Sequence, residues 1–176
     1  MKFAITPVED IGILTISQVA WDMHELLSRP DNQDIADEIP ETFARFTASR
    51  SAALYQLHEK RNSIYRVRHQ DFVTFSGKKA VGMFMLTIHG ETPAGVDEEW
   101  PNISGFVCNP YRNQGLGELS IQRLITEVDN QFFGGAWARI NATNQPAQAL
   151  ARGAGLHPVA EEAAGIVYIY DRVAAQ

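Results

Sequence analysis

Residues 106–128 read FVCNPYRNQGLGELSIQRLITEV and combine three local patterns in a fixed order. A short apolar run, residues 103–108, stops at Asn109-Pro110, a pair that ends strands and starts turns. A turn with glycines at positions 115 and 117 follows. The next segment is amphipathic, with apolar side chains on one side: Leu119, Leu124, Ile125 and Val128. The order predicts a strand, a glycine-containing turn and a helix.

The start of such a helix is suited to bind a phosphate group. The first N–H groups of a helix have no partner within it, and the positive end of the helix dipole favours an anion. Glycines allow the main chain to contact a ligand and to adopt turn dihedrals that other residues resist. An ordinary helix start with incidental glycines is the alternative. The stretch is not a Rossmann fingerprint, because Gly-x-Gly-x-x-Gly is incomplete, nor a P-loop, because no Gly-Lys-Ser/Thr follows.

The spacing Arg112-x-x-Gly115-x-Gly117 resembles the Arg/Gln-x-x-Gly-x-Gly/Ala signature of the GNAT superfamily of N-acetyltransferases, and the strand before it ends in Val-x-Asn-Pro, as in that family. The resemblance implies that the loop holds the pyrophosphate of acetyl-CoA. It also implies that the strand bends away from a parallel neighbour, residues 137–142, and frees amides for the pantetheine arm and the thioester carbonyl. The cofactor-binding residues implied in this way are Phe106, Val107, Cys108, Arg112, Asn113, Gln114, Gly115, Leu116 and Gly117.

A second stretch, residues 144–156, is similar to the later family pattern Asn-x-x-Ala-x-x-Leu-Tyr-x-x-x-Gly-Phe. The matching positions are Asn144, Ala147, Leu150 and Gly155. The resemblance implies that Asn144 contacts the pantetheine arm or the pyrophosphate and that the short helix containing Ala147 flanks the cofactor. Asn is also a preferred N-cap, so Asn144 has a structural role available as well, and both roles can hold.

The chain departs from the family where the chemistry would occur. Position 151 is Ala, whereas most relatives carry Tyr there as the general acid for the departing thiolate. Tyr168 is the candidate replacement, with Tyr111 and Tyr170 as alternatives. A free thiol has a pKa of about 8.5, so solvent could also protonate the thiolate.

The general base is not fixed by the sequence. An amine must lose a proton before it attacks a thioester, and a carboxylate is the usual acceptor. The strand before the loop has no carboxylate, so the candidates are Glu99, in the preceding acidic loop, and His89, at the end of an apolar strand. The alternative to a catalytic role is that Glu99 is simply solvated in its loop and that His89 is an ordinary histidine at the end of a strand. Cys108 is interpreted as a small buried hydrophobe and not as a nucleophile.

The rest of the chain predicts a mixed α/β (α+β) fold that resembles the GNAT fold from end to end, as a single domain over residues 1–176. We expect a mostly antiparallel sheet of six to seven strands, with helices on both faces and a parallel splayed strand pair at the cofactor site. The predicted helices are 11–26, 40–59, the segment after Gly117, and 146–154. The predicted strands are 2–8, 64–68, 72–75, 80–89, 103–108, 137–142 and 166–170, with a hairpin turn at 76–79.

Composition excludes several classes of function. The net charge of −6 argues against sequence-independent nucleic-acid binding. A single cysteine excludes an intramolecular disulfide, and the five histidines lack metal-site spacing. The sequence lacks the Gly-x-Ser-x-Gly elbow that would indicate a serine hydrolase. The sequence lacks a signal-peptide pattern and any apolar run of membrane-spanning length, and this favours the cytoplasm.

We therefore predict a cytoplasmic, acetyl-CoA-dependent N-acetyltransferase without a metal. A primary amine, small molecule or peptide, would attack the thioester directly in a ternary complex, and the family resemblance allows a homodimer. Neither nucleic acid nor a membrane is expected as a partner. The alternative is a non-catalytic acyl-CoA-binding or sensing module that has lost its general acid. A third reading is an α/β domain without a cofactor.

Overall fold

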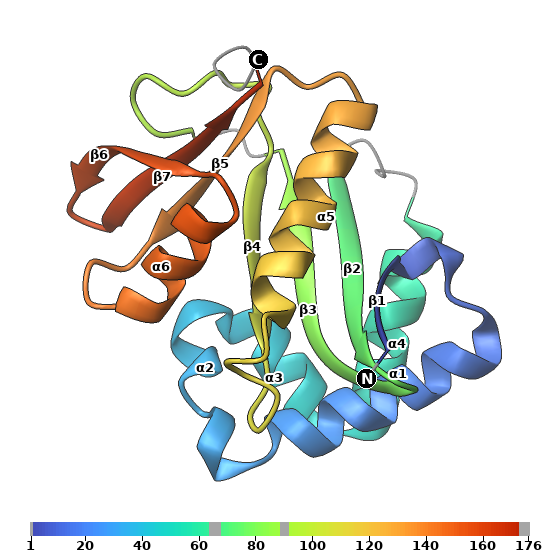
Figure 1. Ribbon diagram of the computed structural model, residues 1–176. Coiled ribbons are helices and arrows are strands. Elements are labelled where there is room, and N and C mark those ends of the chain that lie inside the picture. Colours follow the sequence, from blue (N-terminus) through green and yellow to red (C-terminus); the bar gives the residue numbers. More distant parts are fainter. Residues whose placement is uncertain (1, 64–67, 89–91, 173–176) are drawn as a thin grey trace. The chain divides into compact units, whose positions relative to one another are not determined.

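The computed structural model describes residues 2–63, 68–88 and 92–172 (Figure 1). The described residues form a mixed α/β fold whose seven strands follow the order β1-β2-β3-β4-β5-β7-β6, mostly antiparallel with β4 parallel to β5. The strands are β1 (Phe3–Pro7), β2 (His69–Ser76), β3 (Lys79–Thr87), β4 (Asn102–Val107), β5 (Gly135–Ile140), β6 (His157–Glu162) and β7 (Gly165–Asp171). The α-helices are α1 (Ile13–Leu27), α2 (Ile35–Glu38), α3 (Pro40–Ala48), α4 (Arg50–Asn62), α5 (Leu116–Asn130) and α6 (Gln145–Gly153), and the short 3-10 helices are η1 (Val8–Asp10) and η2 (Pro30–Asn32).

The chain divides into two compact units. The first comprises Met1–Phe84 and Gly105–Leu116, and the second comprises Met85–Ser104 and Gly117–Gln176. That the chain is a single domain over residues 1–176 stays a prediction.

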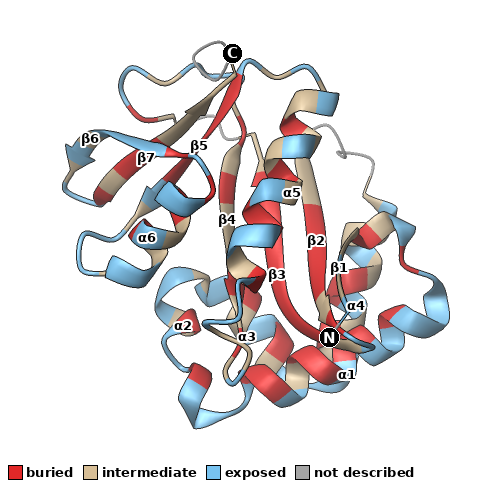
Figure 2. Cartoon of the chain, in the orientation of Figure 1, coloured by how far each residue is buried: buried red, intermediate tan, exposed pale blue. Residues whose placement is uncertain are grey.

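The first unit packs α1, α3 and α4 against each other and encloses a buried apolar core. In α1 the buried side chains recur at helical spacing, at Ile16, Val19, Met23 and Leu26, and this stripe explains why the segment folds as a helix with one face inward. Strands β2 and β3 are buried along most of their length (Figure 2). β1 runs antiparallel to β2, and Gly77 makes the predicted β2–β3 turn with a φ of 65°.

The long helix predicted over residues 40–59 is wrong as a single element. Ser49 adopts an extended conformation and separates α3 from α4. Its side-chain oxygen accepts a hydrogen bond from the Ala52 N–H at 3.0 Å, so Ser49 is the N-cap of α4. The predicted inward residues are confirmed, because Phe46, Ala53 and Leu57 are fully buried and the other two are partly buried, namely Phe43 and Leu54.

Other boundaries differ as well. Residues 28–37 were predicted as a connection but contain η2 and the start of α2. Of the strand predicted over residues 64–68, residues 64–67 lie outside the described residues and Arg68 lies in a turn. Leu119 was predicted on the apolar side of α5 but is 42% exposed. The buried side chains of this helix include Ile121 together with the predicted Leu124 and Val128.

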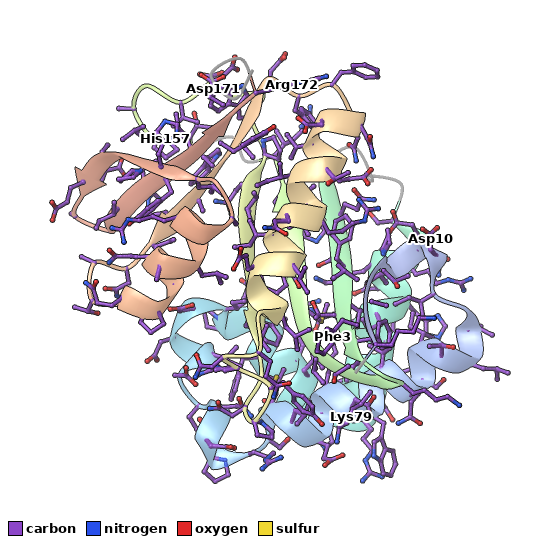
Figure 3. The ribbon with its side chains drawn as sticks, in the orientation of Figure 1. Phe3, Asp10, Lys79, His157, Asp171 and Arg172 are labelled. Atoms are coloured by element: carbon purple, nitrogen blue, oxygen red, sulfur yellow. The ribbon has the colours of Figure 1, made fainter. Side chains whose placement is uncertain are left out.

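The second unit contains an antiparallel ladder in which β7 pairs with both β5 and β6 (Figure 1). β6 was not predicted, because most of its side chains are exposed and show no apolar alternation. The end of β7 is tied to α5: the Tyr170 hydroxyl donates to the Asp129 carboxylate, and Arg172, labelled with Asp171 in Figure 3, lies 3.7 Å from the same carboxylate.

A buried ion-pair cluster joins α4 to β2 in the first unit. Asp71 is 3% exposed, and its two carboxylate oxygens lie 2.5 Å from Lys60 Nζ and 2.7 Å from His69 Nε2. Burial alone would raise the pKa of Asp71, but the hydrogen bond with His69 and the charge of Lys60 lower the pKa below its usual value. A lowered pKa in the folded state stabilises the protein above the unfolded pKa of about 3.9, and this contribution is lost as the pH falls through the folded pKa.

We expect Asp71→Asn to lower the free energy of unfolding by about 1–3 kcal/mol at pH 7, because the variant leaves Lys60 without its buried counter-charge. The difference from the wild type should begin to shrink below about pH 4, where Asp71 of the unfolded chain takes up a proton, and should disappear as the pH falls through the lower pKa of folded Asp71. Urea unfolding between pH 7 and pH 3 measures this dependence. Asp37→Asn, at an exposed carboxylate, is the control and should change stability by less than about 0.5 kcal/mol. A pH-independent difference for Asp71→Asn would contradict the assignment.

Candidate functional site

The end of β4 is fixed closely on β3 by two glycines of the first unit. A Cβ added to Gly82 would run into the Phe106 carbonyl oxygen and lie 3.2 Å from Val107 Cα. A Cβ added to Gly105 would lie 2.5 Å from Phe84 Cδ1 and 2.6 Å from the Met83 carbonyl oxygen. Both positions therefore require glycine for the two strands to approach so closely.

Cys108 follows β4 and is completely buried. Its N–H donates to the Val81 carbonyl oxygen at 2.8 Å, so this amide would have to leave Val81 before it could bind a ligand. Burial raises the pKa of the Cys108 thiol to about 12, an effect that nearby Arg112 only partly opposes. The thiol is therefore protonated at neutral pH, as expected for a small buried hydrophobe and not for a nucleophile.

The loop after Cys108 is a compact turn held by its own residues. The Tyr111 N–H donates to the Cys108 carbonyl oxygen at 2.9 Å, and Gln114 Nε2 donates to the Pro110 carbonyl oxygen at 3.2 Å. Arg112 Nε donates to the Val107 carbonyl oxygen at 2.7 Å. The loop is therefore tied to the strand that precedes it.

The next residues have a main-chain shape that suits an anion. Asn113 and Gly115 have positive φ values of 61° and 76°, whereas Gln114 between them keeps a negative φ. Turns that contain left-handed residues can direct successive N–H groups toward one side, an arrangement that forms anion-binding concavities. Residues 113–115 are exposed, and a Cβ added to Gly115 would meet nothing within 4 Å. Because α5 begins at Leu116, the loop also leads into a helix start, where phosphate is favoured.

Gly117 has a different role from Gly115. A Cβ at position 117 would lie 2.9 Å from Leu150 Cδ2, so the packing of α5 on α6 requires a small residue there. The sequence predicted that both glycines allow close approach of a ligand. In the structure, only Gly115 leaves open space beside the main chain, whereas Gly117 packs against Leu150 within the second unit.

The loop is also held by residues 29–34, which the sequence did not identify as functional. The Asn32 side chain bonds the main chain of Asn109, and the Asn109 side chain donates to the Asp31 carbonyl oxygen at 2.6 Å. Asp34 accepts two hydrogen bonds from the Arg112 guanidinium, at 2.7 and 3.2 Å. No local pattern could have indicated these contacts, because the partners lie 77 and 78 residues apart.

In the second unit, β4 pairs in parallel with β5 at Asn102 opposite Trp137. The capping role of Asn144 is confirmed: its side-chain oxygen accepts from the Ala147 N–H at 3.1 Å at the start of α6. Asn144 and Ala147 are both partly buried. Their predicted contact with a cofactor stays a prediction.

The Tyr168 hydroxyl is enclosed within the second unit. Tyr168 is fully buried and donates to Gln148 Oε1 on α6 at 3.3 Å. Gln148 in turn donates to the Ala142 carbonyl oxygen at 2.9 Å. To act as a general acid, Tyr168 would have to give up its bond to Gln148. Ala151, at the position where the family resemblance implies Tyr, is 1% exposed.

Of the two candidate bases, Glu99 and His89, the structure describes only Glu99. His89 lies outside the described residues. Glu99 is exposed, and its N–H donates to Asp97 Oδ1 at 2.9 Å in a turn that precedes β4. Trp100 anchors the end of this turn, because its carbonyl oxygen accepts from Trp137 Nε1 at 3.1 Å. Glu99 is therefore reachable from solvent on a fixed segment of the second unit, and its catalytic role stays a prediction.

Within residues 2–63, 68–88 and 92–172, no group of His, Cys, Asp and Glu side chains is arranged to hold a metal ion. None of the helices in these same ranges is both long and apolar enough to cross a membrane.

Residues 24–156, well over half of the chain, match the family model described as the acetyltransferase (GNAT) family. Among solved structures, the chain is similar to the PaiA N-acetyltransferase from Thermoplasma acidophilum in complex with coenzyme A, with 10% identity, 97% of this chain and 99% of that chain covered, and a TM-score of 0.66. It is also similar to RimL, a ribosomal L7/L12 alpha-N-protein acetyltransferase in complex with coenzyme A, with 12% identity, 97% and 94% coverage and a TM-score of 0.65.

A third similar structure is the microcin C7 self-immunity acetyltransferase MccE in complex with acetyl-CoA and AMP, with 13% identity, 88% of each chain covered and a TM-score of 0.64. At these identities the likeness shows the fold alone. The comparison with curated proteins found no match.

Proposed function

The chain belongs to the GNAT acetyltransferase family, and we propose that it transfers the acetyl group of acetyl-CoA to a primary amine by direct attack in a ternary complex. The observation that carries this proposal is the shape of residues 113–115. All three residues are exposed, Asn113 and Gly115 are left-handed, and the chain leads from them directly into α5. The acceptor is proposed as a small-molecule or peptide amine, in the cytoplasm.

In this proposal, residues 112–117 hold the pyrophosphate mainly through main-chain N–H groups. The Arg112 guanidinium is engaged by Val107 and Asp34, so its charge is shared with a carboxylate before any ligand arrives. Neutral dipoles of the loop and of the α5 start would provide most of the attraction. Phe106 and Val107 would add main-chain contacts to the pantetheine arm, as the family resemblance implies, and so would Asn144 and Ala147.

The chemistry needs one proton acceptor and one proton donor. The amine lone pair attacks the carbonyl carbon, the carbon–sulfur bond breaks, and the amine proton passes to a base, for which Glu99 and His89 are the proposed candidates. The departing thiolate takes a proton from solvent or from a tyrosine. Because the Tyr168 hydroxyl is buried and bonded to Gln148, we favour solvent, which suffices for a thiol whose pKa is about 8.5.

A non-catalytic acyl-CoA-binding or sensing module is the second candidate. One observation favours it. Buried Ala151 stands where the family resemblance implies a tyrosine as general acid, and the hydroxyl of Tyr168, the proposed replacement, is buried and bonded to Gln148. Such a module would use the same loop for binding and would release no free thiol.

The test is isothermal titration of the purified protein with acetyl-CoA, followed by addition of a pool of amines with detection of free thiol. Binding with thiol release that depends on an amine is the expected result. Binding without release from any amine would favour the sensing module. Absence of binding would refute both candidates.

A further inference from the structure

Asn32 is a fully buried polar residue in the short helix η2, between α1 and α2. Its carboxamide makes three hydrogen bonds. Nδ2 donates to the Leu26 carbonyl oxygen at 2.9 Å and to the Asn109 carbonyl oxygen at 3.4 Å, and Oδ1 accepts from the Asn109 N–H at 2.6 Å. Burial of an amide costs free energy unless it is hydrogen-bonded, so a residue with this burial and these bonds fixes its partners in place.

The Asn32 side chain makes two hydrogen bonds to the main chain of Asn109. One oxygen and one nitrogen of the Asn32 side chain bind the N–H and the C=O of the same residue, as a neighbouring strand would. Asn109 is the first residue of the turn that follows Cys108. Asn32 therefore extends the hydrogen bonding of the main chain just past the end of β4, at the point where the loop begins.

A second pair of contacts continues along the same loop. Asn109 Nδ2 donates to the Asp31 carbonyl oxygen, and Asp34 binds the Arg112 guanidinium in a forked arrangement. Arg112 Nε reaches back to Val107. Residues 107–112 are thus held from both ends, and the exposed residues 113–115 follow directly. All of these residues belong to the first unit.

We propose that Asn32 is a positioning residue for acyl-CoA binding: it fixes the main chain at Asn109 and thereby keeps residues 113–115 in the shape that binds the pyrophosphate. This inference rests on the proposed function. Asn32 itself touches no ligand in this proposal. Its effect passes through Asn109, so its loss raises the dissociation constant and KM for acetyl-CoA and leaves kcat at saturation unchanged.

A purely structural role for Asn32 would lower stability without changing the affinity of the folded protein. Asp22 provides the matched control. It is also buried in the first unit, on α1, and its Oδ2 accepts a hydrogen bond from the Ala80 main-chain N–H at 2.9 Å, 58 residues away. Asp22→Ala therefore removes a buried contact of the same kind, together with a bond from Gln18, and leaves the bonds to residues 109–115 in place.

The experiment compares the wild type with Asn32→Ala and Asp22→Ala by isothermal titration with acetyl-CoA, at a temperature where circular dichroism shows each variant to be folded. Both variants should unfold at lower temperature than the wild type. Asn32→Ala should bind acetyl-CoA about 10- to 100-fold more weakly, whereas Asp22→Ala should bind within about twofold of the wild type. Where an amine acceptor supports turnover, the loss should appear in KM and not in kcat.

Asn32→Ser keeps the inference testable if Asn32→Ala does not fold, because it leaves a polar group at the buried position. The serine side chain is too short to make both bonds to the Asn109 main chain, so this variant should bind acetyl-CoA about three- to tenfold more weakly than the wild type. Wild-type affinity in the folded Asn32→Ala variant, or in Asn32→Ser where that variant alone folds, would overturn the inference while the proposed function stands. An equal loss in Asp22→Ala would also overturn it. A wild-type protein that does not bind acetyl-CoA would refute the proposed function first.

Discussion

Gly115→Glu is expected to eliminate acetyl-CoA binding, with an affinity at least about 100-fold below that of the wild type. The substitution places a side chain and a negative charge on the open main chain where the pyrophosphate is proposed to bind, and like charges held together cost several kcal/mol. It also imposes a φ of 76° on a residue with a Cβ, which costs about 1–2 kcal/mol of stability. Isothermal titration with acetyl-CoA measures the first effect, and thermal unfolding measures the second.

Gly77→Glu separates these two effects. Gly77 has a φ of 65°, and a Cβ there also meets nothing within 4 Å, but it lies in the β2–β3 turn. The variant should lose a similar amount of stability and gain the same charge, yet bind acetyl-CoA like the wild type. If both variants lost binding equally, the effect would be one of folding. Unchanged affinity in Gly115→Glu would remove residues 112–117 from the proposed site.

Gly82→Ala is expected to lower the free energy of unfolding by about 2–4 kcal/mol, which corresponds to about 5–15 °C in Tm. The added Cβ would collide with the Phe106 carbonyl oxygen, and main-chain atoms cannot move aside as a side-chain tip can. The adjustment would push the end of β4 away from β3. Urea unfolding gives the change in stability, and titration with acetyl-CoA reports whether the displaced strand also weakens binding.

The control for this substitution is Gly153→Ala. Gly153 is the last residue of α6, where the nearest neighbour of an added Cβ is the Glu118 side chain at an ordinary 3.5 Å. Alanine favours helix over glycine, so this variant should be neutral or slightly more stable than the wild type. A loss of less than about 1 kcal/mol in Gly82→Ala would show that β3 and β4 separate easily, contrary to their close approach in the structure.

Local patterns were sufficient to predict the secondary structure around the candidate site. The Asn109-Pro110 pair, the spacing of Gly115 and Gly117 and the amphipathic run after them predicted a strand, a turn and a helix, and β4 and α5 confirm this order. Each of these features depends on neighbours within a few residues. The capping role of Asn144 was predictable for the same reason.

Features that depend on distant contacts were not predictable. Spacing could not distinguish Gly115, which is open, from Gly117, which packs on Leu150. Asn32 lies in a segment that was predicted as a polar connection, although it is fully buried and bonds Asn109, 77 residues away. β6 escaped because its exposed side chains carry no periodicity. The candidate general acid lacks a local signature for another reason: position 151, where the family pattern implies a tyrosine, is Ala.

The engagement of Arg112 by Val107 and Asp34 bears on how such loops diverge during evolution. If the guanidinium mainly braces the turn, natural selection acts on the path of the main chain and only weakly on the identity of the side chain at this position. A glutamine amide can also donate a hydrogen bond to a carbonyl oxygen, and the family signature accepts either arginine or glutamine there. Homologues can therefore carry either side chain at this position, whereas the left-handed conformation of Gly115 favours glycine.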